Sequence, residues 1–136
     1  MNIKKILLSG IVSGFVVAVI FWAASLAAQA IFSYNAAKLD GMRDVKDPVM
    51  LLFFLYPWIL SFAMTLVYAK IRPTLQGGIV QKGRKFGILV WVVAAVPSAF
   101  LVYASMNYPL GFTINSLIGS LLYTVAAGMT IAKLIG

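Results

Sequence analysis

Cysteine and histidine are absent from this 136-residue chain, and acidic side chains are scarce. The only acids are three aspartates, Asp40, Asp44 and Asp47. These absences exclude disulfide scaffolds, thiolate or imidazole metal sites, histidine-ligated haem, cysteine nucleophiles and histidine-based triads. A serine with a lysine base is the remaining catalytic option, but no lysine lies near the centre of an apolar segment. We therefore expect no enzyme, no cofactor and no catalytic residue.

Charge of either sign is also rare. Charged residues make up 10% of the chain and hydrophobic residues 62%, whereas a soluble domain averages about a quarter charged residues. So little polar surface excludes a water-soluble monomer. The apolar residues fall into four segments, 6–32, 48–69, 86–106 and 112–134, without a charge in their interiors.

Each segment approaches or exceeds the roughly 20 residues that a helix needs to cross the hydrocarbon layer. Only helices or closed barrels satisfy their backbone groups in lipid, and long apolar runs without alternation favour helices. We predict an all-α fold, with residues 1–136 forming a single transmembrane domain. Its architecture would be a four-helix up-down bundle.

The ends of these segments carry turn signals. Asp47 is a good helix N-cap, and Pro48 after it suits the first helical position. Pro73 is expected to end the second span, and the cluster 107–111 predicts a short turn between antiparallel neighbours.

Basic residues predict the orientation in the membrane. Eight of the eleven flank one side: Lys4, Lys5, Lys70, Arg72, Lys82, Arg84, Lys85 and Lys133. The other three, Lys38, Arg43 and Lys46, are matched by the three aspartates, so the net charge of +8 belongs to one side. The positive-inside rule places this side, with both termini, in the cytoplasm. The prokaryotic cytoplasmic (inner) membrane is the expected location.

The segment 70–85 is predicted to be a basic cytoplasmic loop. Its five cations, Lys70, Arg72, Lys82, Arg84 and Lys85, would contact anionic lipid headgroups, at about 1 kcal/mol each. An acidic partner subunit is the alternative. Nucleic acid is not expected, because no aromatic residue lies between Arg72 and Lys85 for base stacking.

The N-terminal segment has a second interpretation. Lys4 and Lys5, the apolar run and Ala28-Gln29-Ala30 together have the pattern of a secretory signal. The apolar run of about 25 residues exceeds the usual 7–15 of such signals, so we expect it to remain as the first span.

Small residues at four-residue spacing predict where helices meet, because helices in lipid associate by close backbone approach. The predicted contact positions are Gly10, Gly14 and Ala18 in the first span and Ser116, Ser120, Thr124 and Gly128 in the fourth. These faces would pack within the bundle or against another protein. Leucine at Gly14 or Gly128 is expected to disrupt assembly.

An aromatic stripe, Phe54, Trp58 and Phe62, runs along the second span. It is expected to face lipid or to fill a gap between helices, and a protein-docking face is the alternative.

Two prolines lie near the membrane midplane. Pro57 and Pro97 are each about nine residues, or about 14 Å, from the outer ends of their helices. With Ser61 and Ser98 they could form a midplane site or gate, or they could simply kink their helices.

The outer loop holds the three aspartates. Aspartates at this spacing could bind a divalent cation through oxygen atoms if the loop were helical. Arg43 and Lys46 alternate with them, so we predict a self-neutralised loop and no metal site.

The expected function is a non-catalytic structural or accessory subunit, assembling with itself or with other membrane proteins through small-residue helix faces. The alternative is a passive channel, carrier or flippase for a neutral or lipid-like substrate at the proline-kinked second and third spans. The size of the chain also suits a membrane-perforating protein, but no sequence motif indicates that function. Proton-coupled transport is not expected, because no span carries an intramembrane ionisable residue of the kind such transporters use.

Overall fold

The computed structural model describes residues 2–39, 41–44 and 46–136, and its regular elements in these ranges are all helices. The long helices are α1 (Ile3–Phe32), α2 (Met50–Ile71), α3 (Ile79–Val90), α4 (Val96–Ser105) and α5 (Leu110–Ile135). Short helical turns are η1 (Ala36–Lys38), η2 (Arg72–Thr74) and the π-helical turn η3 (Trp91–Ala95). The predicted all-α class is confirmed.

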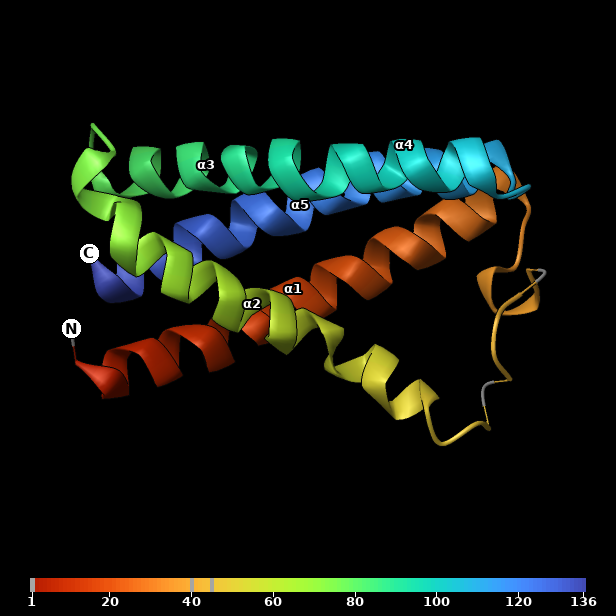
Figure 1. Ribbon diagram of the computed structural model, residues 1–136, viewed down its shortest axis with the longest axis horizontal. Helices are drawn as coiled ribbons and strands as arrows, with labels where there is room; N and C mark the ends of the chain where they lie inside the picture. The colour runs from red at the N-terminus through yellow and green to blue at the C-terminus, as the bar shows by residue number, and fades with distance from the viewer. Residues whose placement is uncertain (1, 40, 45) are drawn as a thin grey trace.

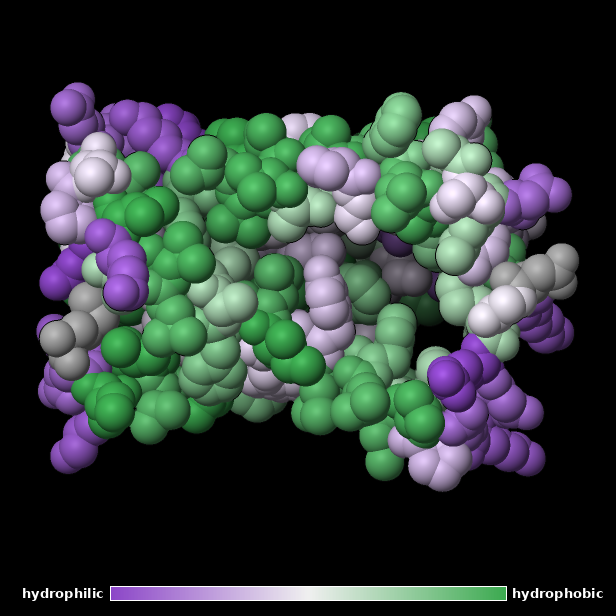
Figure 2. All heavy atoms as spheres, viewed as in Figure 1, coloured by the Kyte–Doolittle hydropathy of each residue, from purple (hydrophilic) through white to green (hydrophobic). Residues whose placement is uncertain are grey.

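Within the described residues, four helical segments are long and apolar enough to cross a membrane: α1, α2 with η2, the continuous run α3–η3–α4, and α5. In the space-filling view, hydrophilic residues gather at the two ends of the molecule and hydrophobic residues cover the middle (Figure 2). This distribution is that of an integral membrane protein.

The main contacts between the helices follow a linear order. The last helix, α5, lies between α1 and α3, and α2 packs mainly on α1 (Figure 1). The N- and C-termini lie at the same end of the molecule, and the loop between α1 and α2 lies at the other (Figure 1). We call these the terminal end and the loop end.

Side chains cap the helix starts. The Asn2 side chain accepts a hydrogen bond from the Lys4 amide (2.9 Å) at the start of α1. Asp47 caps as its sequence suggests, because its Oδ1 accepts a hydrogen bond from the Val49 amide (2.9 Å). The turn that it caps precedes the α-helix, so α2 begins at Met50 rather than at Pro48.

The third span begins well before the position predicted from hydropathy. Gly77 adopts a φ of +107°, which suits glycine, and the Gln81 side chain then accepts a hydrogen bond from the Gly78 amide (3.2 Å). The helix therefore starts at Ile79 instead of Phe86. The predicted basic loop 70–85 is thus mostly helical, and Lys82 and Lys85 lie on α3.

The core lies nearer the terminal end, where α1, α2, α3 and α5 meet. Its largest fully buried side chains include Tyr68 of α2 and Phe86 of α3, whose rings pack edge to face at 5.2 Å. Val17 of α1 and Ile131 of α5 belong to the same cluster. This contact connects α2 to α3 at the terminal end.

Candidate functional site: the helix seams and the open side

The tightest seam joins α3 to α5. A Cβ added at Gly87 would lie 2.5 Å from Val125 Cα and 2.6 Å from the Thr124 carbonyl oxygen, and one added at Gly83 would lie 2.5 Å from Met129 Cα. Gly128 faces Gly83 and Gly87 from the other side. Backbone therefore lies directly on backbone, as expected where glycines four residues apart form a helix contact.

The seam between α1 and α2 pairs glycines with aromatic rings. Phe62 lies over Gly10, and Trp58 lies over Gly14, so that neither glycine has room for a Cβ. The aromatic stripe therefore fills a gap between helices at Trp58 and Phe62. Its third member, Phe54, is exposed.

The seam between α1 and α5 uses small residues on both helices. Ala18 of α1 is buried, and Gly119 of α5 lies against Ala24. On α5, Ser120 and Thr124 are buried and Ser116 is partly buried. Of the sequence-predicted contact positions, Gly10 and Gly14 lie against α2 and Gly128 lies against α3.

The hydroxyls of Ser116, Ser120 and Thr124 bond to backbone carbonyls of their own helix, α5. Thr124 Oγ1 donates to the Ser120 carbonyl (2.7 Å), Ser116 Oγ donates to the Phe112 carbonyl (2.9 Å), and Ser120 Oγ donates to the Leu117 carbonyl (3.0 Å). Each of these hydroxyls therefore has its donor satisfied within α5.

The structure does not bring the four proposed midplane residues together. Pro57 and Ser61 are buried in α2, which packs mainly on α1, whereas Pro97 and Ser98 are exposed on α4, which packs on α5. The two prolines also differ locally, because η3 precedes Pro97: the Val96 amide bonds to the Trp91 carbonyl, five residues back. A π-helical turn of this kind accommodates the interrupted hydrogen-bond ladder.

An aromatic cluster marks where α2 leaves the bundle. The ring of Phe21 in α1 lies 5.8 Å from Phe53, 5.9 Å from Tyr56 and 6.0 Å from Tyr123. The hydroxyls of Tyr56 and Tyr123 are 3.3 Å apart and join α2 to α5. Nearby in α3–α4, Trp91 Nε1 donates to the Leu117 carbonyl (2.8 Å) and fixes that span to α5.

Toward the loop end, α2 is only partly covered by the rest of the chain. All six residues from Leu51 to Tyr56 are exposed, with exposed fractions of 39–68%. The rings of Phe53 and Tyr56 pack on Phe21 and that of Phe54 packs on Trp22, whereas Leu51, Leu52 and Leu55 are about half exposed or more. The molecular surface is hollowed between this part of α2 and α4 (Figure 2). We call this region the open side.

A small apolar pocket of about 270 Å³ lies between α4 and α5. It is lined by Val96, Ala99, Phe100, Tyr103, Thr113 and Leu117.

Basic residues gather at the terminal end, but their roles differ. Arg72 Nη1 donates to the Ile135 carbonyl (3.2 Å) and so caps the end of α5. Lys85 Nζ donates to the Gln76 carbonyl (3.1 Å) across the turn between α2 and α3. Lys70 and Arg84 are exposed, and Lys82 is partly buried.

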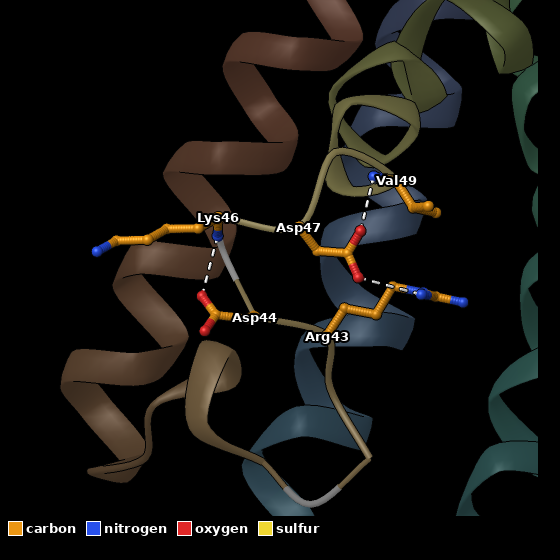
Figure 3. A network of polar contacts seen from close by, with 5 residues as sticks. All are labelled: Arg43, Asp44, Lys46, Asp47 and Val49. Atoms are coloured by element: carbon orange, nitrogen blue, oxygen red, sulfur yellow. Dashed lines mark hydrogen bonds and ion pairs between the residues drawn. The ribbon is translucent and has the colours of Figure 1, made fainter.

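The outer loop forms local pairs (Figure 3). Arg43 Nη1 lies 3.2 Å from Asp47 Oδ2, and Asp44 Oδ1 accepts a hydrogen bond from the Lys46 amide (3.0 Å) rather than pairing with its ammonium. Asp40 lies outside the described residues, and elsewhere in the described chain no cluster of acids suited to a metal ion is found. The loop around Asp44 and Asp47 is not helical, so these two do not share a helix face.

Aromatic residues also gather at the loop end. The rings of Tyr108 and Phe112 pack at 5.0 Å, and Tyr34 packs on Phe112 at 6.3 Å. Burial raises the pKa of the Tyr34 phenol above its usual range.

Two features were not anticipated from the sequence. Gly83 and Gly87 form a G-x-x-x-G pair. Gly83 lies before the predicted start of the third span, because the charged residues around it lower the local hydropathy. The Tyr56–Tyr123 contact joins residues 67 positions apart, and no local pattern identifies such a pair.

The chain matches no protein-family model, no curated protein and no solved structure.

Proposed function

We propose that this protein is a non-catalytic membrane subunit that assembles, with a second copy or with other membrane proteins, through its open side. The observation that carries the proposal is the run of six exposed residues, Leu51–Tyr56, of α2. The small-residue faces are occupied by other helices of the chain, so they are not the surface we propose for assembly.

A polar group on the open side favours protein over lipid as its cover. Pro57 has no N–H to offer the carbonyl of Phe53, four residues earlier, and Phe53 is itself exposed. Acyl chains cannot satisfy such a carbonyl, whereas a neighbouring helix can.

Site-specific photo-crosslinking tests the assembly. A benzophenone amino acid at Leu52 lies on the open side, and the same residue at Leu122 is the matched control, because both leucines are exposed, at 60% and 53%. We expect position 52 to yield one discrete cross-linked polypeptide in the native membrane, and position 122 to yield none. Cross-links to lipid alone at position 52, with a monomeric particle in mild detergent, would refute the proposal.

We further propose an up-down topology with the terminal end in the cytoplasm of a prokaryotic cell, the protein lying in the inner membrane. The support is the excess of basic residues on that side. We propose that exposed Lys70, Arg84 and Lys85 contact anionic headgroups, together with partly buried Lys82 and Arg72. Arg72 has a second role in capping α5, so lipid contact is not its only purpose.

A passive carrier or flippase for a lipid-like substrate is the second candidate. The apolar pocket between α4 and α5 favours it, since it could hold part of an acyl chain. The proposed midplane route through Pro57, Ser61, Pro97 and Ser98 receives no support, because those residues lie apart. Lipid transfer between leaflets of liposomes containing the purified chain would favour this candidate over the first.

A further inference from the structure

The apolar pocket between α4 and α5 is elongated along the two helices. Its lining residues recur at intervals of three and four, which places them on one face of each helix: Val96, Ala99, Phe100 and Tyr103 on α4, and Thr113 and Leu117 on α5. Tyr103 follows Val96 by seven positions, so the pocket extends for about 10 Å along α4.

One end of this pocket lies near the loop end of the molecule. Tyr103 is two positions before the last residue of α4, and Thr113 is three positions after the first residue of α5. Val96 and Leu117 lie deeper in the spans, and the Leu117 carbonyl accepts the hydrogen bond from Trp91 of η3. The pocket therefore runs from the loop-end surface toward the middle of the membrane-spanning region.

The pocket exists because α4 packs less closely on α5 than α3 does. Gly83 and Gly87 of α3 place backbone directly on backbone, whereas Ala99 is the one buried residue of α4. The π-helical turn η3 separates these two segments. The rings of Phe100 and Tyr103 are 74% and 60% exposed, so the pocket opens at the surface of the bundle.

The shape and lining of the pocket select its occupant. The lining is apolar apart from the hydroxyls of Tyr103 and Thr113, which disfavours a charged or strongly polar ligand. A helix about 10–12 Å across is too thick for a volume of about 270 Å³. An acyl chain is thin and flexible, and it reaches a pocket that opens into the hydrocarbon layer directly from that layer.

We propose that this pocket binds one acyl chain of a phospholipid from the loop-end leaflet. The ester end of the chain lies beside Tyr103 and Thr113, and its methyl end lies beside Val96 and Leu117. Tyrosine is enriched at the level of the headgroups, which agrees with this orientation. The inference deepens the second candidate function, on whose pocket it rests, and it requires neither transport nor assembly through the open side.

Native mass spectrometry of the chain purified in mild detergent tests the site. We expect the wild type to retain one phospholipid per chain and Ala99→Phe to lose it. A phenyl ring fits this pocket, because an apolar cavity of about 150 Å³ already holds benzene. Ala104→Phe is the matched control: Ala104 is exposed on the same helix and does not line the pocket, so this variant should keep the lipid.

Photo-crosslinking of the wild type gives a readout that does not depend on the folding of Ala99→Phe. The probe is a phosphatidylcholine with a diazirine at the methyl end of one acyl chain, incorporated into nanodiscs and followed by a detergent wash. We expect the retained probe to label Leu117. Ile118 is next to Leu117 in the chain, is 57% exposed and lies outside the pocket, so it should be unlabelled.

Three results would overturn the lipid site: a wild type that retains no phospholipid, a folded Ala99→Phe variant that retains it, or equal labelling of Leu117 and Ile118. Lipid transfer between liposome leaflets is measured separately. Retention of the phospholipid without transfer would reject the second candidate function and support the binding site.

Discussion

At the residue scale, glycine has two different roles in this chain. Gly77 supplies a backbone conformation that other residues rarely adopt, whereas Gly83, Gly87 and Gly128 supply the absence of a side chain. The second role determines how closely α3 and α5 approach, and helix association in lipid depends on such close approach.

Alanine at Gly87 should destabilise the fold, because its Cβ would overlap the backbone of α5. Overpacking of this kind costs about 1–3 kcal/mol. Gly78→Ala is the control, since a Cβ there would meet no atom within 4 Å. Equal midpoints for the two variants in thermal unfolding would contradict the close α3–α5 contact.

The same contacts change what is expected of leucine at Gly14 or Gly128. Both positions face helices of their own chain. We therefore expect these substitutions to disturb the fold of the monomer, and not only its assembly. In mild detergent, we expect the leucine variants to lose the monodisperse particle rather than to shift cleanly from oligomer to monomer.

At the scale of helices, hydropathy predicted the number of spans but not the start of the third. Lys82, Arg84 and Lys85 lower the local hydropathy, yet Gly83, Phe86 and Gly87 continue one buried helix face through them. Hydropathy averages over all sides of a helix, whereas packing selects one side. Element boundaries that depend on tertiary contacts are therefore the least predictable part of this fold.

Hydrogen exchange checks this boundary. Residues 83–88, whose amides are bonded within α3, should exchange slowly, and residues 75–78 in the preceding turn should exchange fast. The contrast follows because helical amides exchange only when the helix opens. Uniformly fast exchange from 75 to 85 would instead support a basic loop.

The candidate site was less predictable than the helices. Small-residue spacing in single spans identified Gly10, Gly14 and Gly128 as contact positions, and the structure places each against another helix. Which helix they meet depends on the order of packing, which spacing does not encode. For the same reason Pro57 and Pro97 shared a predicted depth but lie on helices with different neighbours.

At the scale of the whole molecule, the cysteine-free sequence allows a direct test of orientation. A cysteine at Met42, in the exposed outer loop, should react with a membrane-impermeant maleimide on intact cells. A cysteine at Gln76, in the turn at the terminal end, should react only after lysis. The opposite pattern would reverse the proposed topology.

The central place of α5 has a consequence for biosynthesis. Half of its most apolar stretch is buried, against 17% for the α3–α4 span, yet it leaves the ribosome after α1, α2, α3 and α4. Until it enters the membrane, the small faces of α1 and α3 that pack on it have no partner. Nascent chains arrested before residue 110 should therefore be degraded by membrane proteases that recognise these unpaired helix faces.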